Sequence, residues 1–438
     1  MNDTIVALAS GAGRAGVAVI RISGPRAGDV LSALTGAELP EPRRSKRAVL
    51  YGVSRDSIDD GLVLWFPAPA SFTGEDVAEL HAHGGPAIVA ALIQACLAQP
   101  ETRLAEPGEF TRRAFEHGKL DLAQAEALAD LVEAETEAQR AQALRQMRGE
   151  LSALYEGWRA RLIEAMALLE AEIDFPDEDR PGGLAAQVQP LVAALSAEIA
   201  AHLDDAHRGE RIRDGYRIAI LGPPNAGKSS LLNALARREA AIVSDIPGTT
   251  RDVVEIRLVL AGFPVWVADT AGLRDAADSI EAEGVRRALE RAEQADLRLG
   301  LVEAGREADP ALTRAMRPQD LLLRSKIDLD EDGAGPGVSA VTGAGLAELE
   351  ALLAASVASA LGSEEAPALT RARHRRLLED ALAALTRAGP ALEPESGLGP
   401  ELAAEDLRAA AASLGRLSGR IDVEDLLDEV FANFCIGK

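Results

Sequence analysis

Hydrophobic and polar positions follow different patterns in successive parts of the chain. In the first 118 residues, short apolar runs at 4–8, 17–22 and 62–66 and a helix-like stretch at 86–97 are separated by glycines and prolines. Short apolar runs bounded by such turn residues are typical of strands, and their mixture with a helical pattern indicates an α/β fold. We therefore predict an α/β domain over residues 1–118.

The rest of the chain shows two further patterns of apolar and polar residues. Residues 119–213 and 363–438 are rich in Ala, Leu, Glu and Arg with apolar residues three and four apart, which predicts long amphipathic helices. Residues 214–362 between them alternate strand-like and helical stretches, the pattern of a parallel α/β domain. We predict one long-helix domain, built from both flanks and interrupted by an inserted parallel α/β domain, because the two ends of a domain commonly lie close together.

Composition restricts the compartment and the partners. The 70 acidic side chains outnumber the 46 basic ones among 438 residues, a formal net charge of −24. This charge argues against sequence-independent binding to nucleic acids or anionic membranes, so contact with RNA is expected only at basic segments such as 43–47 and 371–376. Such clusters are more often solvated surface or helix-end charge, and that interpretation stays open for both segments. With two cysteines, no zinc-ligand spacing, no membrane-length apolar run and no basic signal region, a cytoplasmic protein without membrane contact is predicted.

A phosphate-binding loop opens the predicted insert. Residues 216–221 read as a strand, GPPNAGKS follows at 222–229, and a helical stretch comes next. In this context glycines let backbone N–H groups surround phosphate oxygens, Lys228 offsets the charge of the β and γ phosphates in catalysis, and the Ser229 hydroxyl ligates Mg²⁺. A plain glycine turn would need neither side chain. The nucleotide-binding residues predicted here are Asn225, Ala226, Gly227, Lys228, Ser229 and Ser230.

Two further segments are predicted to complete the phosphate and magnesium site. The apolar run 265–268 ends in DTAG, where an acid at a strand end can hold Mg²⁺ through water and a glycine amide can face the γ-phosphate. The sequence GTTRD at 248–252 is a candidate switch loop, whose Thr250 hydroxyl would join the Mg²⁺ shell only with the γ-phosphate present. The predicted residues are Gly248, Thr249, Thr250, Asp269, Thr270, Ala271 and Gly272.

A base-recognition segment follows the apolar run 321–323. Its SKID sequence, with Ser339 and Ala340 at the end of another short strand, resembles the guanine-reading pair of GTPases. In those proteins an aspartate, here Asp328, accepts hydrogen bonds from N1–H and N2–H₂ of the base, and the stem of a lysine, here Lys326, lies over the ring. GTP is therefore the expected ligand, and an ATPase is disfavoured but stays open.

Two departures from the GTPase pattern affect this prediction. Ser325 stands where GTPases usually have asparagine, so we expect somewhat weaker packing of the base loop. The chain also has no identifiable arginine finger and no glutamine after DTAG to position the attacking water. Asn225 and the acidic stretch 275–283 could fill that gap, although such a stretch is more often a solvated helix start.

Motifs along the whole chain resemble one family. DTIVALAS, AVIRISGP, SFTGEDVAELHAHGGP, EPGEFTRRAFEHGKLDLAQAEAL, the insert and the terminal CIGK are similar to the MnmE (TrmE) family of tRNA modification GTPases. The resemblance implies an N-terminal domain like those of tetrahydrofolate-dependent aminomethyltransferases and a helical domain interrupted by a Ras-like P-loop GTPase domain, in a homodimer. It also implies that the protein, with an FAD-dependent partner protein, modifies carbon 5 of the wobble uridine, position 34, of certain tRNAs. The products would carry aminomethyl or carboxymethylaminomethyl groups.

The resemblance further implies cofactors and site residues. K⁺ would replace the arginine finger, since a cation beside the phosphates supplies the same charge stabilisation. The one-carbon donor would be 5-formyl- or 5,10-methylene-tetrahydrofolate, whose pterin edge a glutamate can bind and whose tail suits cations. The implied residues are Asn225, Ser244, Ile246 and Thr249 for K⁺, Asp245 and Pro247 in the same nucleotide-binding loop, Glu281 for the attacking water, and Arg21, Glu79, Lys119 and Lys438 for the folate.

Other interpretations stay open at this point. Cys435 is a candidate reactive thiol by its position in the motif, but it could equally be a small apolar residue in a C-terminal turn. Each folate residue, taken singly, would be interpreted as surface charge. A regulatory GTPase switch in ribosome assembly is the alternative function, which the insert alone would satisfy, whereas the N-terminal motifs and CIGK favour tRNA modification.

Overall fold

The computed structural model describes residues 3–174, 185–238, 255–269, 292–329, 336–362, 367–393 and 400–421, together with residues 427, 430, 431, 434 and 437. The chain forms two compact units. The first contains residues 1–129, 147–167 and 407–438, and the second contains residues 130–146 and 168–406. Within the described ranges, no helix combines the length and the apolar character needed to cross a bilayer.

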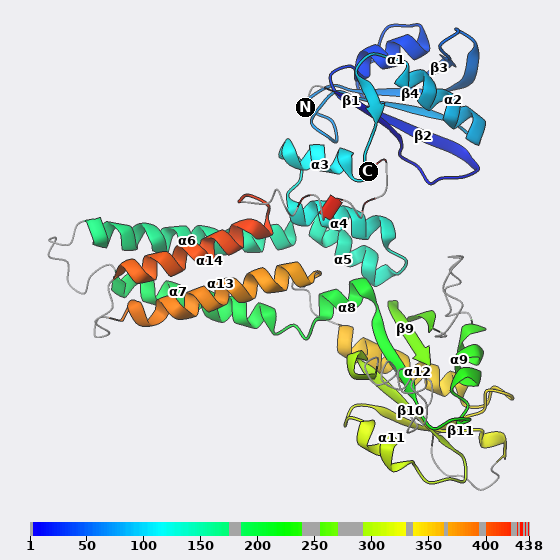
Figure 1. The fold of residues 1–438 in the computed structure, drawn as a ribbon, viewed down its shortest axis with the longest axis vertical. Helices are drawn as coiled ribbons and strands as arrows, with labels where there is room; N and C mark the ends of the chain where they lie inside the picture. Colours follow the sequence, from blue (N-terminus) through cyan, green and yellow to red (C-terminus); the bar gives the residue numbers. More distant parts are fainter. Residues whose placement is uncertain are drawn as a thin grey trace, which may run out of the picture. The chain divides into compact units, whose positions relative to one another are not determined.

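The first unit begins with a six-stranded sheet in the order β3-β4-β5-β2-β1-β6. Neighbouring strands are antiparallel except β1 and β6, which are parallel. Helices α1 and α2 cover one face of this sheet (Figure 1). The elements are β1 (Thr4–Leu8), β2 (Ala15–Ser23), α1 (Ala27–Thr35), β3 (Lys46–Tyr51), β4 (Ser57–Phe66), β5 (Val77–Gly84), α2 (Pro86–Leu97) and β6 (Thr102–Leu104).

Alternation along β2 separates core residues from site residues. Ile20 and Ile22 are fully buried in the core beneath α1 and α2. Arg21 lies between them in the sequence and therefore points to the opposite face, where its guanidinium approaches the rings of Phe72 and Phe110. Helix α3 (Glu109–Glu116) supplies Phe110, so it covers part of that second face.

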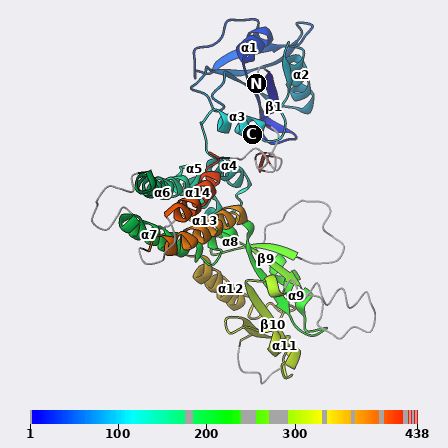
Figure 2. The same ribbon diagram turned by 60° about the vertical axis from the view of Figure 1, so that its left-hand side comes forward.

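Helices from both sides of the insert pack together, as the sequence predicts. In the first unit, Leu122 of α4 lies in one buried cluster with Phe431. In the second unit, α7 lies along α13 (Figure 2), and Thr370 donates a hydrogen bond to Gln146 at 3.1 Å. The helices are α4 (Leu122–Glu133), α5 (Glu137–Met147), α6 (Glu150–Asp174), α7 (Ala185–Leu203), α8 (Arg208–Asp214), α13 (Ala372–Ala391) and α14 (Pro400–Leu417).

The insert holds a second six-stranded sheet, in the order β12-β11-β10-β7-β9-β8. The predicted parallel sheet is correct for five strands, but β8 is antiparallel to β9, because a tight turn with positive φ at Ala261 and Gly262 (51° and 81°) joins them as a hairpin. The elements are β7 (Tyr216–Leu221), α9 (Lys228–Ala236), β8 (Glu255–Leu260), β9 (Phe263–Asp269), β10 (Leu297–Glu303), α11 (Pro310–Ala315), β11 (Leu321–Ser325), the short 3₁₀ helix η1 (Ile327–Leu329), β12 (Gly337–Val338) and α12 (Leu346–Leu361).

Candidate functional site

The phosphate-binding loop has the strand, loop and helix arrangement that its sequence predicts. β7 ends at Leu221, and α9 begins at Lys228 directly after the loop. Gly222, Asn225 and Gly227 all have positive φ, at 155°, 66° and 93°. A side chain at Gly222 would be strained, because its Cβ would lie 2.8 Å from the carbonyl oxygen of Leu301. The loop therefore depends on glycine where the backbone turns toward the start of α9. The free N–H groups at this helix start can donate hydrogen bonds to phosphate oxygens.

Lys228 lies folded back over this loop. Its ammonium donates hydrogen bonds to the carbonyl oxygens of Gly222 at 2.9 Å and Pro223 at 3.1 Å, and its side chain is buried. Burial lowers the pKa of Lys228, and the negative charge of Asp269 opposes that shift. The loop carbonyls thus hold a cation beside the place where a phosphate chain would lie.

Ser229 and Asp269 form a pair of oxygen ligands next to the loop. The Ser229 hydroxyl donates to Asp269 Oδ2 at 2.5 Å, across from α9 to the end of β9. The other carboxylate oxygen, Oδ1, is buried and has no hydrogen-bond partner among the described residues. Hydroxyl and carboxylate oxygens are the ligands that Mg²⁺ prefers, so these two residues fit a magnesium ion shared with a phosphate. Of the predicted ligands, Thr250 lies outside the described residues.

The predicted base loop lies beside the phosphate loop. Ser325, at the end of β11, is buried, and its Cβ is 4.0 Å from the position that a Cβ on Gly227 would take. Lys326 follows with a φ of 58°, and the exposed Asp328 lies on η1. Ser339 and Ala340 come directly after β12, the neighbour of β11. Parallel strands deliver these loops to one edge of the sheet, where nucleotides bind in open α/β folds.

Sequence reasoning missed one charged partner in this region. Glu303, the last residue of β10, accepts a hydrogen bond from the Lys326 ammonium at 3.0 Å. The strand register pairs Glu303 with Ser325 across β10 and β11, and this long-range pairing brings the two charges together. Local sequence contains no signal for such a pair. The one related feature is that β10, like β9, is an apolar strand that ends in an acid, which marks Glu303 as a strand-end carboxylate but does not identify its partner.

Several predicted residues lie outside the described part of the chain. They belong to the switch segments and to the C-terminus: Ser244, Asp245, Ile246, Pro247, Gly248, Thr249, Thr250, Thr270, Ala271, Gly272, Glu281, Cys435 and Lys438. Their roles stay predictions from the sequence.

The N-terminal sheet brings two of the predicted folate residues together. Arg21 on β2 and Glu79 on β5 are cross-strand partners, and their side chains form an ion pair at 3.0 Å. His81, two residues further along β5, approaches the other Glu79 oxygen at 3.2 Å. Arg21 also lies 5.4 Å from the ring centre of Phe72. The alternation of a strand places positions 79 and 81 on one face, so His81 could have been found from the sequence.

The remaining folate predictions are only partly placed. Lys119 does not join the Arg21 and Glu79 pair, since its ammonium donates to the carbonyl oxygen of Pro69 at 3.0 Å. Gly437 lies against the end of β1, where a Cβ on it would be 2.2 Å from the carbonyl oxygen of Leu8. Leu8 is adjacent in β1 to Ala7, the cross-strand partner of Arg21. The penultimate residue of the chain therefore lies close to the strands that carry the Arg21 and Glu79 pair.

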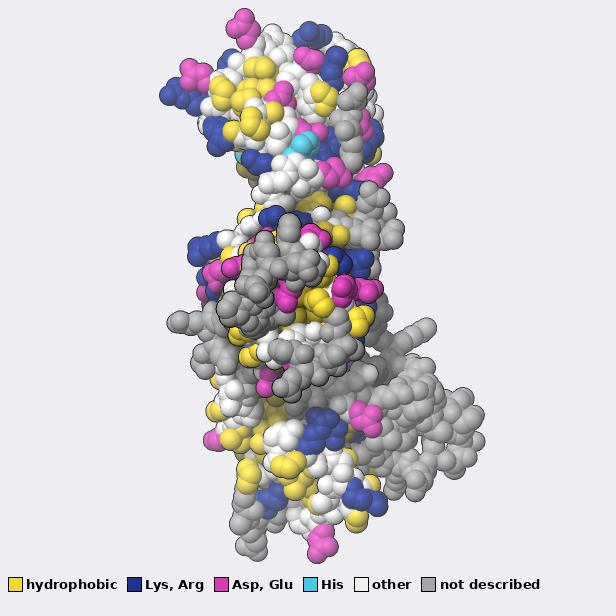
Figure 3. Space-filling view, turned by 90° about the vertical axis from the view of Figure 1, so that its left-hand side faces the viewer, with side chains coloured by type: hydrophobic (Ala, Val, Ile, Leu, Met, Phe, Trp, Pro, Cys, Tyr) yellow, Lys and Arg dark blue, Asp and Glu magenta, His cyan; other side chains and the backbone are white. Residues whose placement is uncertain are grey.

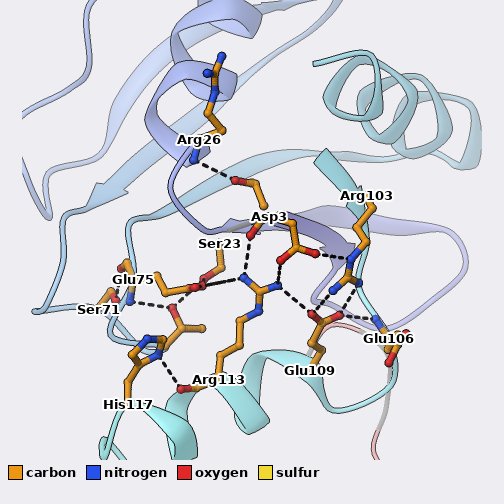
Figure 4. A network of polar contacts seen from close by, with 12 residues as sticks. Asp3, Ser23, Arg26, Ser71, Glu75, Arg103, Glu106, Glu109, Arg113 and His117 are labelled. Atoms are coloured by element: carbon orange, nitrogen blue, oxygen red, sulfur yellow. Dashed lines mark hydrogen bonds and ion pairs between the residues drawn. The ribbon is translucent and has the colours of Figure 1, made fainter. Parts of the chain in front are cut away.

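A buried ion network supports this part of the domain (Figure 4). Arg113 on α3 is only 1% exposed, and its guanidinium bonds Asp3, Glu75 and Glu109 at 2.9–3.2 Å. A second arginine, Arg103, bonds Asp3 and Glu109 from the β6 side. The network thereby connects the start of β1, the loop before β5 and α3.

Two acids of this network, Glu109 and Asp3, have lowered pKa values. Burial alone would raise the pKa values of Glu109 and Asp3, but hydrogen bonds and charge from Arg103 and Arg113 outweigh burial and lower both. Because the folded pKa values are below those of the unfolded chain, the network stabilises the protein above about pH 4 and this contribution is lost as the pH falls.

Replacing Arg113 by methionine is expected to destabilise the protein by about 3–5 kcal/mol at pH 7, because it leaves buried carboxylates without their partner. The difference from the original chain should shrink toward pH 3, as the acids become protonated. Chemical denaturation at both pH values measures this. Arg47→Met, at an exposed ion pair with Asp60, is the matched control and should change the free energy of unfolding very little. A small, pH-independent loss in the Arg113 variant would contradict the role of the network.

Several arginines of the basic segments proposed for RNA contact are paired with acids. Arg371 bonds Asp130, and Arg375 bonds Asp205 and Glu210 within the second unit. In the first unit, Arg47 pairs with Asp60. The described surface in Figure 3 likewise shows basic and acidic side chains interspersed. These arginines form ion pairs with acids of the same chain, so they offer less free positive charge to RNA than their sequence predicts.

The fold and the loops define a P-loop nucleotide-binding protein whose α/β nucleotide domain interrupts a helical one. The family model for the MnmE helical domain matches residues 122–435, and that for the TrmE N-terminus, described as a GTP-binding protein, matches residues 4–119. The chain belongs to the MnmE family of tRNA modification GTPases.

Full-length relatives agree with this assignment. The tRNA modification GTPase MnmE of Parvibaculum lavamentivorans is 59% identical over 440 residues, and that of Maricaulis maris is 54% identical over 444 residues, each covering 100% of both chains. Among solved structures, Era of Aquifex aeolicus aligns over 40% of this chain and 66% of its own, at 24% identity and a TM-score of 0.27.

Proposed function

We propose that the chain hydrolyses GTP and couples this to the modification of tRNA. The observation that carries the proposal is the meeting of the phosphate and base loops, with Ser325 beside Gly227. The name shared by the full-length relatives, tRNA modification GTPase, supports the choice of nucleotide and of pathway. The proposal requires that the full chain bind GTP much more tightly than ATP, which a binding assay with both nucleotides measures.

The described residues have separate tasks in this reaction. The start of α9 and the Lys228 ammonium bind the β and γ phosphates and offset the charge that develops on them. Ser229 and Asp269 would hold Mg²⁺, which would neutralise phosphate charge. Asp328 accepts hydrogen bonds from the guanine edge, while the Lys326 stem covers the ring. Thr250, the Gly272 amide and Glu281 complete the site around the γ-phosphate and the attacking water.

K⁺ is proposed to supply the charge that an arginine finger gives elsewhere. Asn225 supports this, because it is exposed in the phosphate loop with a left-handed backbone. Ser244, Ile246 and Thr249 would provide the other ligands. The ion would also bring the nucleotide domains of a homodimer together.

Exchanging K⁺ for Na⁺ is expected to lower GTP turnover at least tenfold with little loss of GTP affinity, since removing one transition-state charge costs on the order of 10²-fold or more. Steady-state hydrolysis and GTP binding in both salts measure the effect. Asn225→Gly keeps the left-handed backbone and should abolish the K⁺ stimulation, whereas Asn233→Gln, an exposed position on α9, should retain it. Equal rates in the two salts would refute the role of the cation.

The N-terminal domain is proposed to bind a tetrahydrofolate as one-carbon donor. Arg21 and Glu79 supply a guanidinium and a carboxylate on one face of the sheet, close to the half-buried Phe72, whose ring suits the flat pterin. Lys119, Lys438 and the Cys435 thiol are the further contributions that we propose from the resemblance. The one-carbon unit would be added to carbon 5 of uridine 34 with an FAD-dependent partner protein, which would also carry much of the tRNA contact.

Replacing Glu79 by glutamine is expected to weaken binding of 5-formyl-tetrahydrofolate about tenfold or more, because a charged acceptor for the pterin edge is lost. Affinity for GTP should not change, since the two sites are in different domains. Titration calorimetry on the full chain measures both ligands. Glu41→Gln, at an exposed ion pair with Arg44, serves as the control. Unchanged folate affinity in the Glu79 variant would place the folate elsewhere.

A further inference from the structure

The base loop, residues 325–328, makes three contacts with the end of β10 and the residue that follows it. The Ser325 hydroxyl donates to the Val302 carbonyl oxygen at 3.4 Å, and the Ala304 amide donates to the Ser325 carbonyl oxygen at 2.9 Å. The third contact is the ion pair between the Lys326 ammonium and Glu303 at 3.0 Å. Of these three contacts, only the last involves a side chain that is proposed to touch the base, that of Lys326.

Lys326 requires such a hold because of its backbone. Its φ of 58° lies in the left-handed region, which residues other than glycine seldom adopt. The next residues form η1, which carries Asp328. The conformation of Lys326 therefore sets the direction in which the chain presents the aspartate to the base. A contact that fixes Lys326 also fixes Asp328.

The Ser325 side chain is too short to link the base loop to the phosphate loop. Its buried side chain faces the phosphate loop, with its Cβ 4.0 Å from the Cβ position of Gly227. A longer amide side chain at this position would reach across to that loop. The serine hydroxyl instead bonds back to Val302 on its own neighbouring strand. In the described part of the chain, the serine therefore makes no side-chain contact that links the base loop to the phosphate loop, and the position of the base loop depends more on its contacts to β10.

We propose that Glu303 is a positioning residue for guanine recognition, which substitutes for the link that an asparagine at position 325 would make. Glu303 acts through Lys326 and, by way of the backbone, through Asp328. Its side chain is 22% exposed and that of Lys326 is 32% exposed, so solvent weakens the pair but leaves its geometry defined. The inference rests on the proposed function, that the chain binds GTP.

The test compares GTP with inosine triphosphate, which lacks the 2-amino group and so loses one of the two hydrogen bonds to Asp328. Affinities of the full chain for both nucleotides are measured for the original chain, Glu303→Ala, Glu303→Gln, Ser325→Asn and the Glu303→Ala and Ser325→Asn double variant. Loss of Glu303 should weaken GTP binding about 3- to 10-fold. It should reduce the preference for GTP over inosine triphosphate by a similar factor, and change kcat at saturating GTP less than twofold. Ser325→Asn should restore both in the double variant.

Controls separate positioning from general damage. Glu307→Ala removes an exposed acid from the segment directly after β10 and should change the affinity for neither nucleotide. Glu303→Gln keeps the size of the side chain, so it carries the test if the alanine variant does not fold. An unchanged GTP preference in Glu303→Gln, or no rescue by Ser325→Asn, would overturn the inference. Failure of the original chain to bind GTP would instead contradict the proposed function.

Discussion

Replacing Lys228 by alanine is expected to lower GTP turnover by about 10²–10³-fold or more, which is the cost of removing one preorganised charge from a transition state. The Lys228 ammonium is held against the carbonyl oxygens of Gly222 and Pro223, beside the place where a phosphate chain would lie. The effect should fall on kcat at saturating GTP as well as on binding. Single-turnover hydrolysis measures it.

Lys46 provides the matched control for Lys228. It is an exposed lysine at the start of the edge strand β3 and has no role in the proposed nucleotide or folate sites. Lys46→Ala should leave the turnover of GTP unchanged. If Lys228→Ala also left turnover within about threefold of the original, the loop would not be the site of hydrolysis, since a lost transition-state donor costs far more.

Replacing Asp328 by asparagine is expected to change the preferred base from guanine to xanthine, with GTP affinity reduced on the order of 10²-fold, because two hydrogen bonds to a charged acceptor are lost. Xanthine carries a carbonyl oxygen where guanine carries its 2-amino group, and an asparagine amide can donate to that oxygen. Competition between GTP and xanthosine triphosphate for the full chain measures the change.

Asp309 is a suitable control for this substitution. It caps α11 in the same domain by accepting a hydrogen bond from the Ala311 amide at 2.7 Å, and asparagine caps helices equally well. Asp309→Asn should therefore retain the preference for GTP. Persistent guanine preference in Asp328→Asn would remove Asp328 from base recognition and reopen the ATPase interpretation.

Elements that depend on local pattern could be predicted from the sequence. The apolar run 4–8 is β1, the helical stretch 86–97 is α2, and the strand before the phosphate loop spans 216–221. Glycines or prolines mark both ends of the second and third of these elements, and apolar runs fill all three. The phosphate loop followed from the same kind of information, since its residues are contiguous.

Features that depend on long-range pairing could not be predicted in this way. Arg113 reads as one of several charges on a surface helix, yet it is 1% exposed, because Asp3 and Glu75 from two distant segments converge on it together with Glu109 of its own helix. The basic segment 371–376 reads as an RNA patch, but Arg375 is bound to Asp205, 170 residues away. The reversal of β8 required a left-handed conformation at Ala261, which alanine rarely signals.

Mass spectrometry of wobble uridines tests the central claim, that this GTPase acts in tRNA modification. The gene is deleted in its host, and tRNA is compared with that of strains that again carry either the original gene or the Lys228→Ala variant. Aminomethyl and carboxymethylaminomethyl groups at carbon 5 of uridine 34 should be lost on deletion and restored only by the original gene. A normal modification profile in the deletion strain would contradict the account and favour a GTPase switch in another process, such as ribosome assembly.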